Sequence, residues 1–359
     1  MHRSWGDGSW GRGSSGRGSS GTPRRLGAGL TGALMCSVAL VLGGCGTLST
    51  KEDRRFAETL ADEHYPGVLR VVEVHKLFPQ AGGSEVAFSV TGDPDAVVRI
   101  RVDAGAGTCN THDCRKVLAD AVGRGRSEAA RLRLLTRTFR TCGHEVIGVE
   151  PSSGAPWIVA SPANATVSRV LDDIGSCVRR WVEADGRSGG TAHARGASVN
   201  IVSPAVARRR PAGKKSQPTA MRLSETRLLA ALQSRPYFVA SYSASQGRID
   251  TTGSARIVQP FETRQKFAAT VGAAVRARLR ASYPNVQMSA YQGVWRLEPG
   301  TVDRLTGYVL YCERPDGEKR CLGDRAVVVT TDARGEPVGE VRPAGKVREG
   351  RGPLRLPPL

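Results

Sequence analysis

Residues 167–182 read VSRVLDDIGSCVRRWV, and their apolar side chains recur at intervals of three and four residues. The apolar positions are Val167, Val170, Leu171, Ile174, Cys177, Val178, Trp181 and Val182. This spacing places them on one side of an α-helix, while Asp172 and Asp173 fall on the opposite, solvated side. The stretch therefore predicts an amphipathic helix whose apolar stripe, with Cys177 on it, faces a protein core.

Strand-like runs and further helices lie on both sides of this stretch. Residues 85–90 and 96–102 flank Gly92-Asp93-Pro94-Asp95, a turn composition that indicates a β-hairpin. Other apolar runs predict strands at 69–74, 145–149, 156–160, 237–242, 255–258, 307–311 and 326–330. Helices are expected at 51–64, 223–233 and 261–282, and from Cys114 toward Phe139 with Gly123 and Gly125 as break points. Because helices and hairpins mix without regular strand–helix alternation, the expected fold class is α+β, with helices on mostly antiparallel sheets.

Composition predicts two domains joined by a linker. Residues 186–220 hold seven basic and no acidic side chains and few large apolar groups, which is typical of a flexible connector. Within it, only residues 197–202 read as a short strand. The expected organisation is a first α+β domain at 45–185, the basic linker at 186–220, a second α+β domain at 221–345 and a basic, proline-rich tail at 346–359.

The first 44 residues have the pattern of a secretory signal peptide. Residues 1–25 hold five arginines and one aspartate among many glycines and serines. Residues 26–44 carry no charge, and an apolar run at 33–42 is followed by small residues. A basic flank, a short apolar run and a small-residue cleavage site are typical of an export signal. Arg24 and Arg25 leave the choice between the general and the twin-arginine export route open.

The residues Leu42-Gly43-Gly44-Cys45 resemble the lipobox of bacterial lipoproteins, here in a high-GC, actinomycete type of sequence. The resemblance implies cleavage before Cys45, thioether lipidation of its sulfur and acylation, such as palmitoylation, of the new amino terminus. Several acyl chains, at ~0.8 kcal/mol per buried methylene, anchor a protein stably. The expected location is therefore the extracytoplasmic face of the cell membrane. The alternative is an uncleaved signal anchor, because the 19 uncharged residues are long enough to span a bilayer.

Six cysteines remain once Cys36 and Cys45 are set aside: Cys109, Cys114, Cys142, Cys177, Cys312 and Cys321. An even number outside the cytoplasm predicts three disulfides. Spacing favours Cys109 with Cys114 in one short loop and Cys312 with Cys321 across a turn, which leaves Cys142 with Cys177.

The segment between Cys312 and Cys321 also predicts a strand register. Asp316-Gly317 is a favoured two-residue hairpin turn, and it would set Cys312 directly opposite Cys321 in a non-hydrogen-bonded pair with Cα atoms ~4.5 Å apart. A three-residue loop would instead set Cys312 opposite Arg320.

Residue types suited to catalysis or metal binding are sparse after the signal peptide. The chain from Cys45 has no GxSxG, HExxH, P-loop or CxxC motif. Zinc is the alternative use of Cys109, Cys114 and Cys142 together with His112 and His144, but oxidation competes with it outside the cytoplasm. We therefore expect no catalytic residue, metal or cofactor, and a non-enzymatic binding or envelope-associated protein.

Two other functions stay open as alternatives. A transporter's solute-binding lipoprotein would suit the length of the chain from Cys45, although it requires alternating strand–helix units. An extracytoplasmic hydrolase would require a cleft that gathers carboxylates with histidines. All five candidate histidines precede the expected second domain: His64, His75, His112, His144 and His193.

Charge indicates the class of partner. The 359 residues have a net charge of +19, and the chain from Cys45 holds 47 basic and 32 acidic side chains. Besides the bilayer reached through Cys45, the polyanions available to an exported protein are anionic lipids and wall polymers, not nucleic acid. We expect the basic linker and second domain to contact them, and a solubilising role is the alternative.

One helix face carries Arg126, Arg133, Arg137 and Arg140, either as an anion-binding ridge or as a solvated face.

The lipobox generates a direct prediction. Replacing Cys45 with Ala removes the sulfur that would carry the lipid, so the variant should leave the membrane fraction for the soluble fraction. Fractionation followed by immunoblotting measures this. Unchanged membrane retention would indicate an uncleaved anchor instead.

Overall fold

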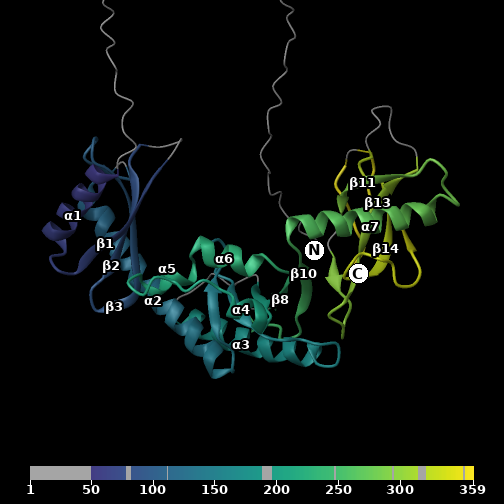
Figure 1. Cartoon of the computed structure of the whole chain (residues 1–359), viewed down its shortest axis with the longest axis horizontal. Coiled ribbons are helices and arrows are strands. Elements are labelled where there is room, and N and C mark those ends of the chain that lie inside the picture. The colour runs from purple at the N-terminus through teal and green to yellow at the C-terminus, as the bar shows by residue number, and fades with distance from the viewer. Residues whose placement is uncertain are drawn as a thin grey trace, which may run out of the picture. The chain divides into compact units, whose positions relative to one another are not determined.

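A computed structural model describes residues 50–77, 82–110, 112–187, 196–245, 248–292, 295–313, 321–350 and 352–359 (Figure 1). Helices and antiparallel-rich sheets make up the described chain, so the predicted α+β class is confirmed. The strands form three separate sheets, and the first two share helix α2 (Cys114–Thr141). The signal peptide and Cys45 lie outside the described residues.

The first sheet is antiparallel, in the order β1 (Leu69–Lys76), β2 (Ser84–Val90), β3 (Asp93–Asp103) and β4 (Thr108–Cys109). Helix α1 (Lys51–His64) and the first half of α2 pack against it. Phe88, Val98 and Leu118 are fully buried in the core that they enclose. The hairpin expected around Gly92-Asp93-Pro94-Asp95 is present, with the backbone N–H of Asp95 donating to the Asp93 carboxylate at 3.2 Å.

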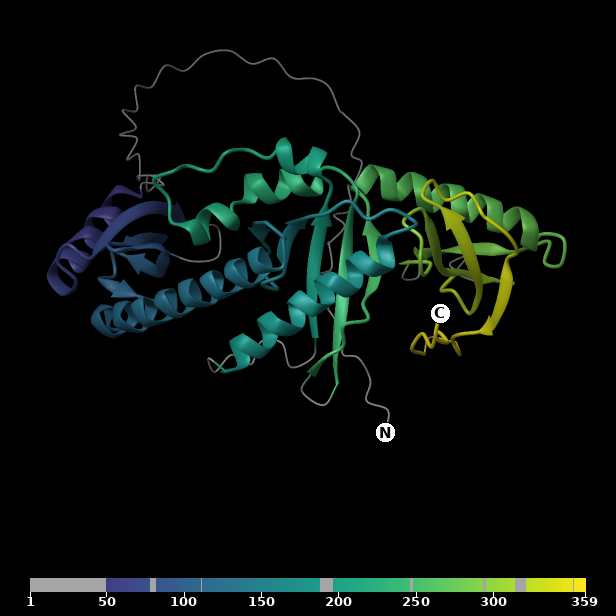
Figure 2. The ribbon, with the colours of Figure 1, turned by 90° about the horizontal axis from the view of Figure 1, so that it is seen from below.

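The second sheet has the order β10 (Ser254–Val258), β8 (Tyr237–Ser245), β7 (Gly196–Val202), β6 (Pro156–Val159) and β5 (Val146–Val149), and β9 (Arg248–Ile249) pairs with β8. Its β6–β7 pair is parallel and its other pairs are antiparallel. Helix α3 (Val167–Arg187) and the end of α2 share a core with Ile158 on one face (Figure 2). Trp157, on the other face, packs with α4 (Pro204–Arg208) and α6 (Thr226–Gln233).

The expected flexible linker at 186–220 needs correction, because β7 lies inside it. This strand pairs with β6 on one side and β8 on the other, so one sheet uses residues from both sides of the expected domain boundary. Its apolar side chains are buried on both faces of the sheet, with Ile201 in one core and Val202 in the other. Among the basic residues that suggested a linker, Arg187 ends α3 and Arg208 ends α4, and four others lie in the chain that follows α4: Arg209, Arg210, Lys214 and Lys215. Residues 188–195 lie outside the described part of the chain.

The third sheet is antiparallel, in the order β11 (Gln287–Gln292), β13 (Arg304–Cys312), β14 (Arg325–Asp332) and β15 (Arg342–Lys346), with β12 (Arg296–Leu297) beside β13. Helix α7 (Phe261–Leu279) packs Val271 and Val275 against one face. Part of the expected tail contacts the other face, where Val347 is buried and the Tyr308 hydroxyl donates to the carbonyl of Pro357.

The three predicted disulfides are all present: Cys109–Cys114, Cys142–Cys177 and Cys312–Cys321. The predicted register at the third is wrong. Strands β13 and β14 pair Tyr311 with Arg325, so Cys321 precedes β14 and does not stand directly opposite Cys312. The Cα atoms of the two cysteines are 5.7 Å apart. The pairing of β13 with β14 therefore ends before the cysteines, and the Asp316-Gly317 turn lies outside the described residues.

Helix α2 runs without a break through Gly123 and Gly125, where the sequence suggested an interruption. A Cβ atom at Gly125 would lie 2.4 Å from the carbonyl oxygen of Val97, so this glycine allows α2 to cross β3 at close range. A Cβ atom at Gly123 would meet nothing within 4 Å. The two glycines therefore differ in their structural roles, although they look alike in the sequence.

This difference predicts opposite effects of two matched substitutions. Gly125→Ala should destabilise the protein by about 1–3 kcal/mol, because the helix and β3 must move apart. Gly123→Ala should stabilise it by about 0.5–1 kcal/mol, because alanine loses less backbone entropy in a helix. Thermal or urea unfolding compares the two variants, and equal shifts would show that the Gly125 contact does not limit the packing.

A buried carboxylate connects α1 to the first sheet. Asp53 is 4 % exposed, and its carboxylate accepts hydrogen bonds from the Ser84 hydroxyl at 2.5 Å, the Ala104 N–H at 3.0 Å and the Lys76 ammonium at 3.3 Å. Burial by itself raises the pKa of Asp53, but these three donors outweigh it and the pKa lies below its ordinary value.

The lowered pKa predicts a pH-dependent contribution to stability. Since Asp53 ionises more readily in the folded chain, it stabilises the fold above its unfolded pKa of about 3.9, and this contribution is lost as the pH falls through the folded pKa. Asp53→Asn should cost about 1.5–3 kcal/mol at pH 7 and less below pH 4. Asp62→Asn, at an exposed position of the same helix, is the control. A pH-independent difference in melting temperature between Asp53→Asn and the unsubstituted protein would contradict this assignment.

Candidate functional site

The four arginines that the sequence placed on one helix face all lie on α2. We call Arg126, Arg133, Arg137 and Arg140 the arginine ridge. Because α2 is continuous, their spacing of seven, four and three residues aligns them along the flank of its buried side. The whole helix carries eight basic and two acidic side chains, so its exposed surface is strongly positive.

One member of the arginine ridge is engaged inside the molecule. The Arg133 guanidinium lies 2.7 Å from the carboxylate of Asp93 and 3.2 Å from that of Asp95. Hydrogen bonds to these two carboxylates, Asp93 first, raise the pKa of Arg133 above its ordinary value. The aspartates of the β2–β3 turn thus connect the hairpin to α2, and Arg133 has a structural role.

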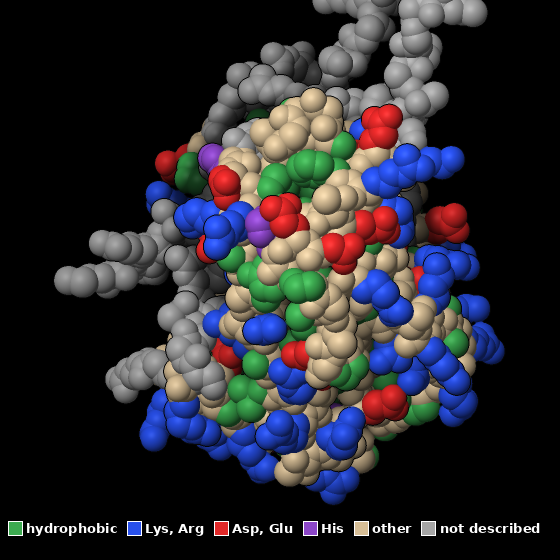
Figure 3. All heavy atoms as spheres, turned by 90° about the vertical axis from the view of Figure 1, so that its left-hand side faces the viewer, with side chains coloured by type: hydrophobic (Ala, Val, Ile, Leu, Met, Phe, Trp, Pro, Cys, Tyr) green, Lys and Arg blue, Asp and Glu red, His purple; other side chains and the backbone are tan. Residues whose placement is uncertain are grey.

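The remaining members, Arg126, Arg137 and Arg140, are exposed and form no ion pair with any residue that the structure describes. They span 15 residues of helix, whose ends are 14 residue steps or about 21 Å apart at 1.5 Å per residue. In the space-filling view of Figure 3, Lys and Arg side chains gather over the lower part of the face, where α2 lies in Figure 1. The three arginines are therefore free to contact anionic groups outside the protein.

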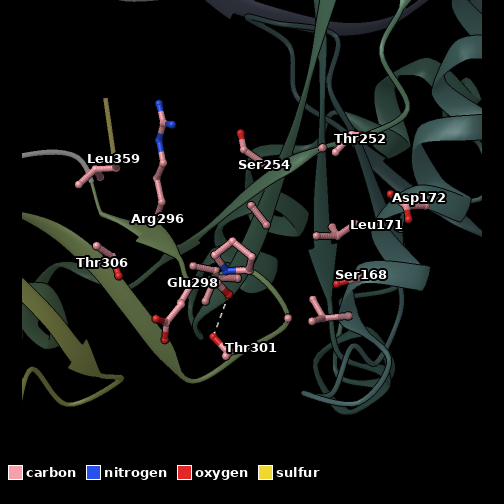
Figure 4. Close-up of a pocket in the computed structure, with 16 residues that line it drawn as sticks. Ser168, Leu171, Asp172, Thr252, Ser254, Arg296, Glu298, Thr301, Thr306 and Leu359 are labelled. Atoms are coloured by element: carbon pink, nitrogen blue, oxygen red, sulfur yellow. Dashed lines mark hydrogen bonds between the residues drawn. The ribbon is translucent and has the colours of Figure 1, made fainter. Parts of the chain in front are cut away.

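A cavity of about 550 Å³ is a second candidate site (Figure 4). It is bounded by the start of α3, by residues 252–255 and by residues 296–301. Gly175 allows the chain before residue 252 to approach α3, because a Cβ atom there would lie 2.2 Å from the carbonyl oxygen of Thr251. Asn164 bridges to the far wall, where its side-chain oxygen accepts from the Val302 N–H at 2.8 Å.

Some polar groups of the cavity are hydrogen-bonded within the protein, and others have no ion-pair partner among the described residues. The Thr306 hydroxyl is hydrogen-bonded to Thr330 at 3.0 Å, and the Thr301 hydroxyl donates to the Glu298 carbonyl at 3.0 Å. Arg296 and Asp172 lie on opposite sides of the cavity and form no ion pair within the described chain. Apolar side chains complete the lining: Val167, Leu171, Ala255, Leu297, Pro299 and Leu359. Such a mixed lining can hold a small organic molecule.

The histidines do not assemble into this cavity. Four of them fall within the described residues, and none lines it: His64, His75, His112 and His144. The imidazole of His75 contacts the Glu73 carboxylate at 3.0 Å on β1. Burial lowers the pKa of His144, and the charge of Asp173 partly opposes this effect. His193 lies outside the described part of the chain.

The cysteines of the alternative zinc site are consumed in disulfides. Cys109 pairs with Cys114, and Cys142 pairs with Cys177, so these thiols cannot ligate a metal ion in this state. Throughout the described ranges, no three His, Cys, Asp or Glu side chains are grouped as metal ligands. Nor is any helix in those ranges both long enough and apolar enough to cross a bilayer.

Comparisons with protein-family models, with curated proteins and with solved structures found no match to this chain. The residues of the two candidate sites are therefore assigned from geometry and chemistry alone.

Sequence reasoning missed the cavity and the ion pair of a buried aspartate with an exposed arginine beside the arginine ridge. Asp185 on α3 is 3 % exposed and lies 3.4 Å from the Arg131 guanidinium on α2. The sequence does not indicate this ion pair, because the two residues are 54 positions apart in the chain. It does not indicate the cavity either, since the walls come from three distant segments.

Proposed function

We propose that this protein is a membrane-anchored, extracytoplasmic lipoprotein that binds anionic lipids or anionic wall polymers without catalysing a reaction. The observation that carries the proposal is the set of three exposed arginines on α2, Arg126, Arg137 and Arg140, that no described carboxylate neutralises. A row of cations about 21 Å long matches the repeated negative charge of a polymer or of a headgroup layer.

The disulfides and the lipobox support the location. Structural disulfides such as these three form and persist chiefly in an oxidising compartment, which for a bacterial chain lies outside the cytoplasm. The resemblance of Leu42-Gly43-Gly44-Cys45 to a lipobox supports anchoring through Cys45. An anchored protein stays within reach of headgroups and wall polymers, so weak electrostatic contacts suffice for binding.

Basic residues at the end of α4 and in the chain after it add to the same interaction. Arg208, Arg209, Lys214 and Lys215 are exposed, while Arg210 is paired with the Glu145 carboxylate at 3.0 Å. Each Lys or Arg near an anionic membrane surface contributes about 1 kcal/mol, and salt screens the attraction over ~8 Å at 0.15 M. The binding is therefore expected to depend on charge and ionic strength.

A solute-binding lipoprotein is the second candidate, and the cavity of about 550 Å³ favours it. Ligand sites for small molecules commonly have this size and a similar mixture of apolar and polar groups. The strand directions disfavour a transporter's binding protein, which requires alternating strand–helix units. Among the described strands, β6–β7 is the single parallel pair.

Co-sedimentation of the protein without its first 45 residues tests the proposal, with vesicles rich in phosphatidylglycerol or with an anionic wall polymer. We expect binding at 30 mM salt that weakens as salt is raised. Replacing Arg126, Arg137 and Arg140 together with Ser should weaken it at least about tenfold, since each contributes about 1 kcal/mol.

The matched control replaces three exposed arginines that lie outside the arginine ridge, the basic linker and the second predicted domain with Ser: Arg55, Arg169 and Arg180. It changes the net charge equally and should weaken binding at most about threefold. Absence of binding at low salt would contradict the proposal. If both triple variants lose the same amount of affinity, the arginine ridge is not the site that binds the anionic surface.

A further inference from the structure

The first sheet ends in a free edge. Strand β1 is eight residues long and pairs only with β2 among the described strands, whereas β4, at the opposite edge, has two residues. An unpaired edge presents a row of backbone donors and acceptors that an extended chain can bind. This edge is therefore the longest template for strand addition in the first sheet.

The hydrogen-bond pattern identifies which residues of β1 point outward. The Thr91 N–H donates to the Val68 carbonyl at 2.7 Å, and the Leu77 N–H donates to the Gly83 carbonyl at 3.2 Å. Hydrogen-bonded and non-hydrogen-bonded pairs alternate along an antiparallel ladder. Counting inward from both ends, Val71 and Val74 direct their backbone N–H and C=O groups away from β2. Leu69 and Lys76 face outward by the same count, and a β-bulge between Val71 and Glu73 separates Val71 from Val74.

A groove of about 640 Å³ runs along this edge. Six consecutive residues of β1, Arg70 to His75, line it. The other lining residues are Arg54 from α1 and Lys214, Ser216 and Gln217 from the chain before α5 (Thr219–Leu223). Arg54 of α1 and the segment 214–217 therefore form the walls of the groove beside the strand edge.

The charges of the groove select the chemistry of an occupant. Arg54 forms an ion pair with Glu58 at 3.2 Å, and the Glu73 carboxylate contacts the imidazole of His75 at 3.0 Å. Arg70 and Lys214 are exposed and have no carboxylate partner in the described ranges. An extended segment with acidic side chains would place carboxylates beside these two cations while its backbone pairs with β1.

We propose that the edge of β1 binds an extended acidic segment of a partner protein, which joins the first sheet as an additional strand. Backbone pairing at Val71 and Val74 supplies the affinity, and Arg70 and Lys214 select the acidic sequence. This interaction goes beyond the binding of anionic surfaces, because it requires backbone donors in the ligand as well as negative charge.

Fluorescence anisotropy of the full chain in detergent tests the proposal, with a labelled octapeptide of alternating valine and glutamate as the probe. A peptide of the same sequence with every amide N-methylated keeps the charge and loses the backbone donors. We expect the first peptide to bind with a dissociation constant below 1 mM and the second to bind at least tenfold more weakly. Hydrogen exchange of the Val71 and Val74 amides should slow when the first peptide is bound.

Two adjacent lysines provide matched variants. Lys214→Glu should weaken peptide binding at least fivefold, whereas Lys215→Glu, an equal change of charge outside the groove, should change it less than twofold. Three results would overturn the proposal: equal binding of both peptides, which would indicate charge alone, unchanged exchange at Val71 and Val74, or self-association of the chain through β1 that excludes the peptide.

Discussion

A single helix, α2, supplies side chains to two hydrophobic cores, and the arrangement of the first two sheets depends on its continuity. Its first half buries Leu118 against the first sheet, and its second half buries Phe139 against the second. A helix of 28 residues is about 42 Å long, so it can serve both cores without interruption. Gly125 makes this possible, because any side chain there would collide with the backbone of Val97 where the helix crosses β3.

Polar and covalent contacts then hold α2 in this position. Arg133 binds the two aspartates of the β2–β3 turn, and Arg131 pairs with the buried Asp185 of α3. The disulfide of Cys142 with Cys177 connects the end of α2 to the middle of α3. Because two neighbours use the buried side of α2, the remaining arginines are left on its exposed flank. The charge proposed to contact anionic surfaces is thus a consequence of how the helix packs.

The arginine ridge and the edge of β1 differ in how they would recognise a partner. Exposed cations attract any dense array of negative charge, and salt weakens that attraction over a distance of ~8 Å at 0.15 M. A strand edge is directional, because its donors and acceptors accept only an extended backbone in register. The arginine ridge would therefore recognise a charged surface beside a lipid anchor, whereas the edge of β1 would recognise a single extended protein segment. The cavity between α3 and β12 is of a third kind, since its opposed Arg296 and Asp172 would orient a small molecule.

The sequence by itself determined the features that act over a few residues. Apolar periodicity predicted the α3 helix with Cys177 on its buried side, turn residues predicted the hairpin at Asp93, and cysteine spacing predicted all three disulfides. Only the tertiary structure placed β7 within the second sheet, set the register of β13 on β14 and brought Asp53 together with its donors. It also decided the walls of the cavity and the groove. These features depend on contacts between residues far apart in the chain, and such contacts leave no local pattern because their energy comes from burial and pairing with distant partners.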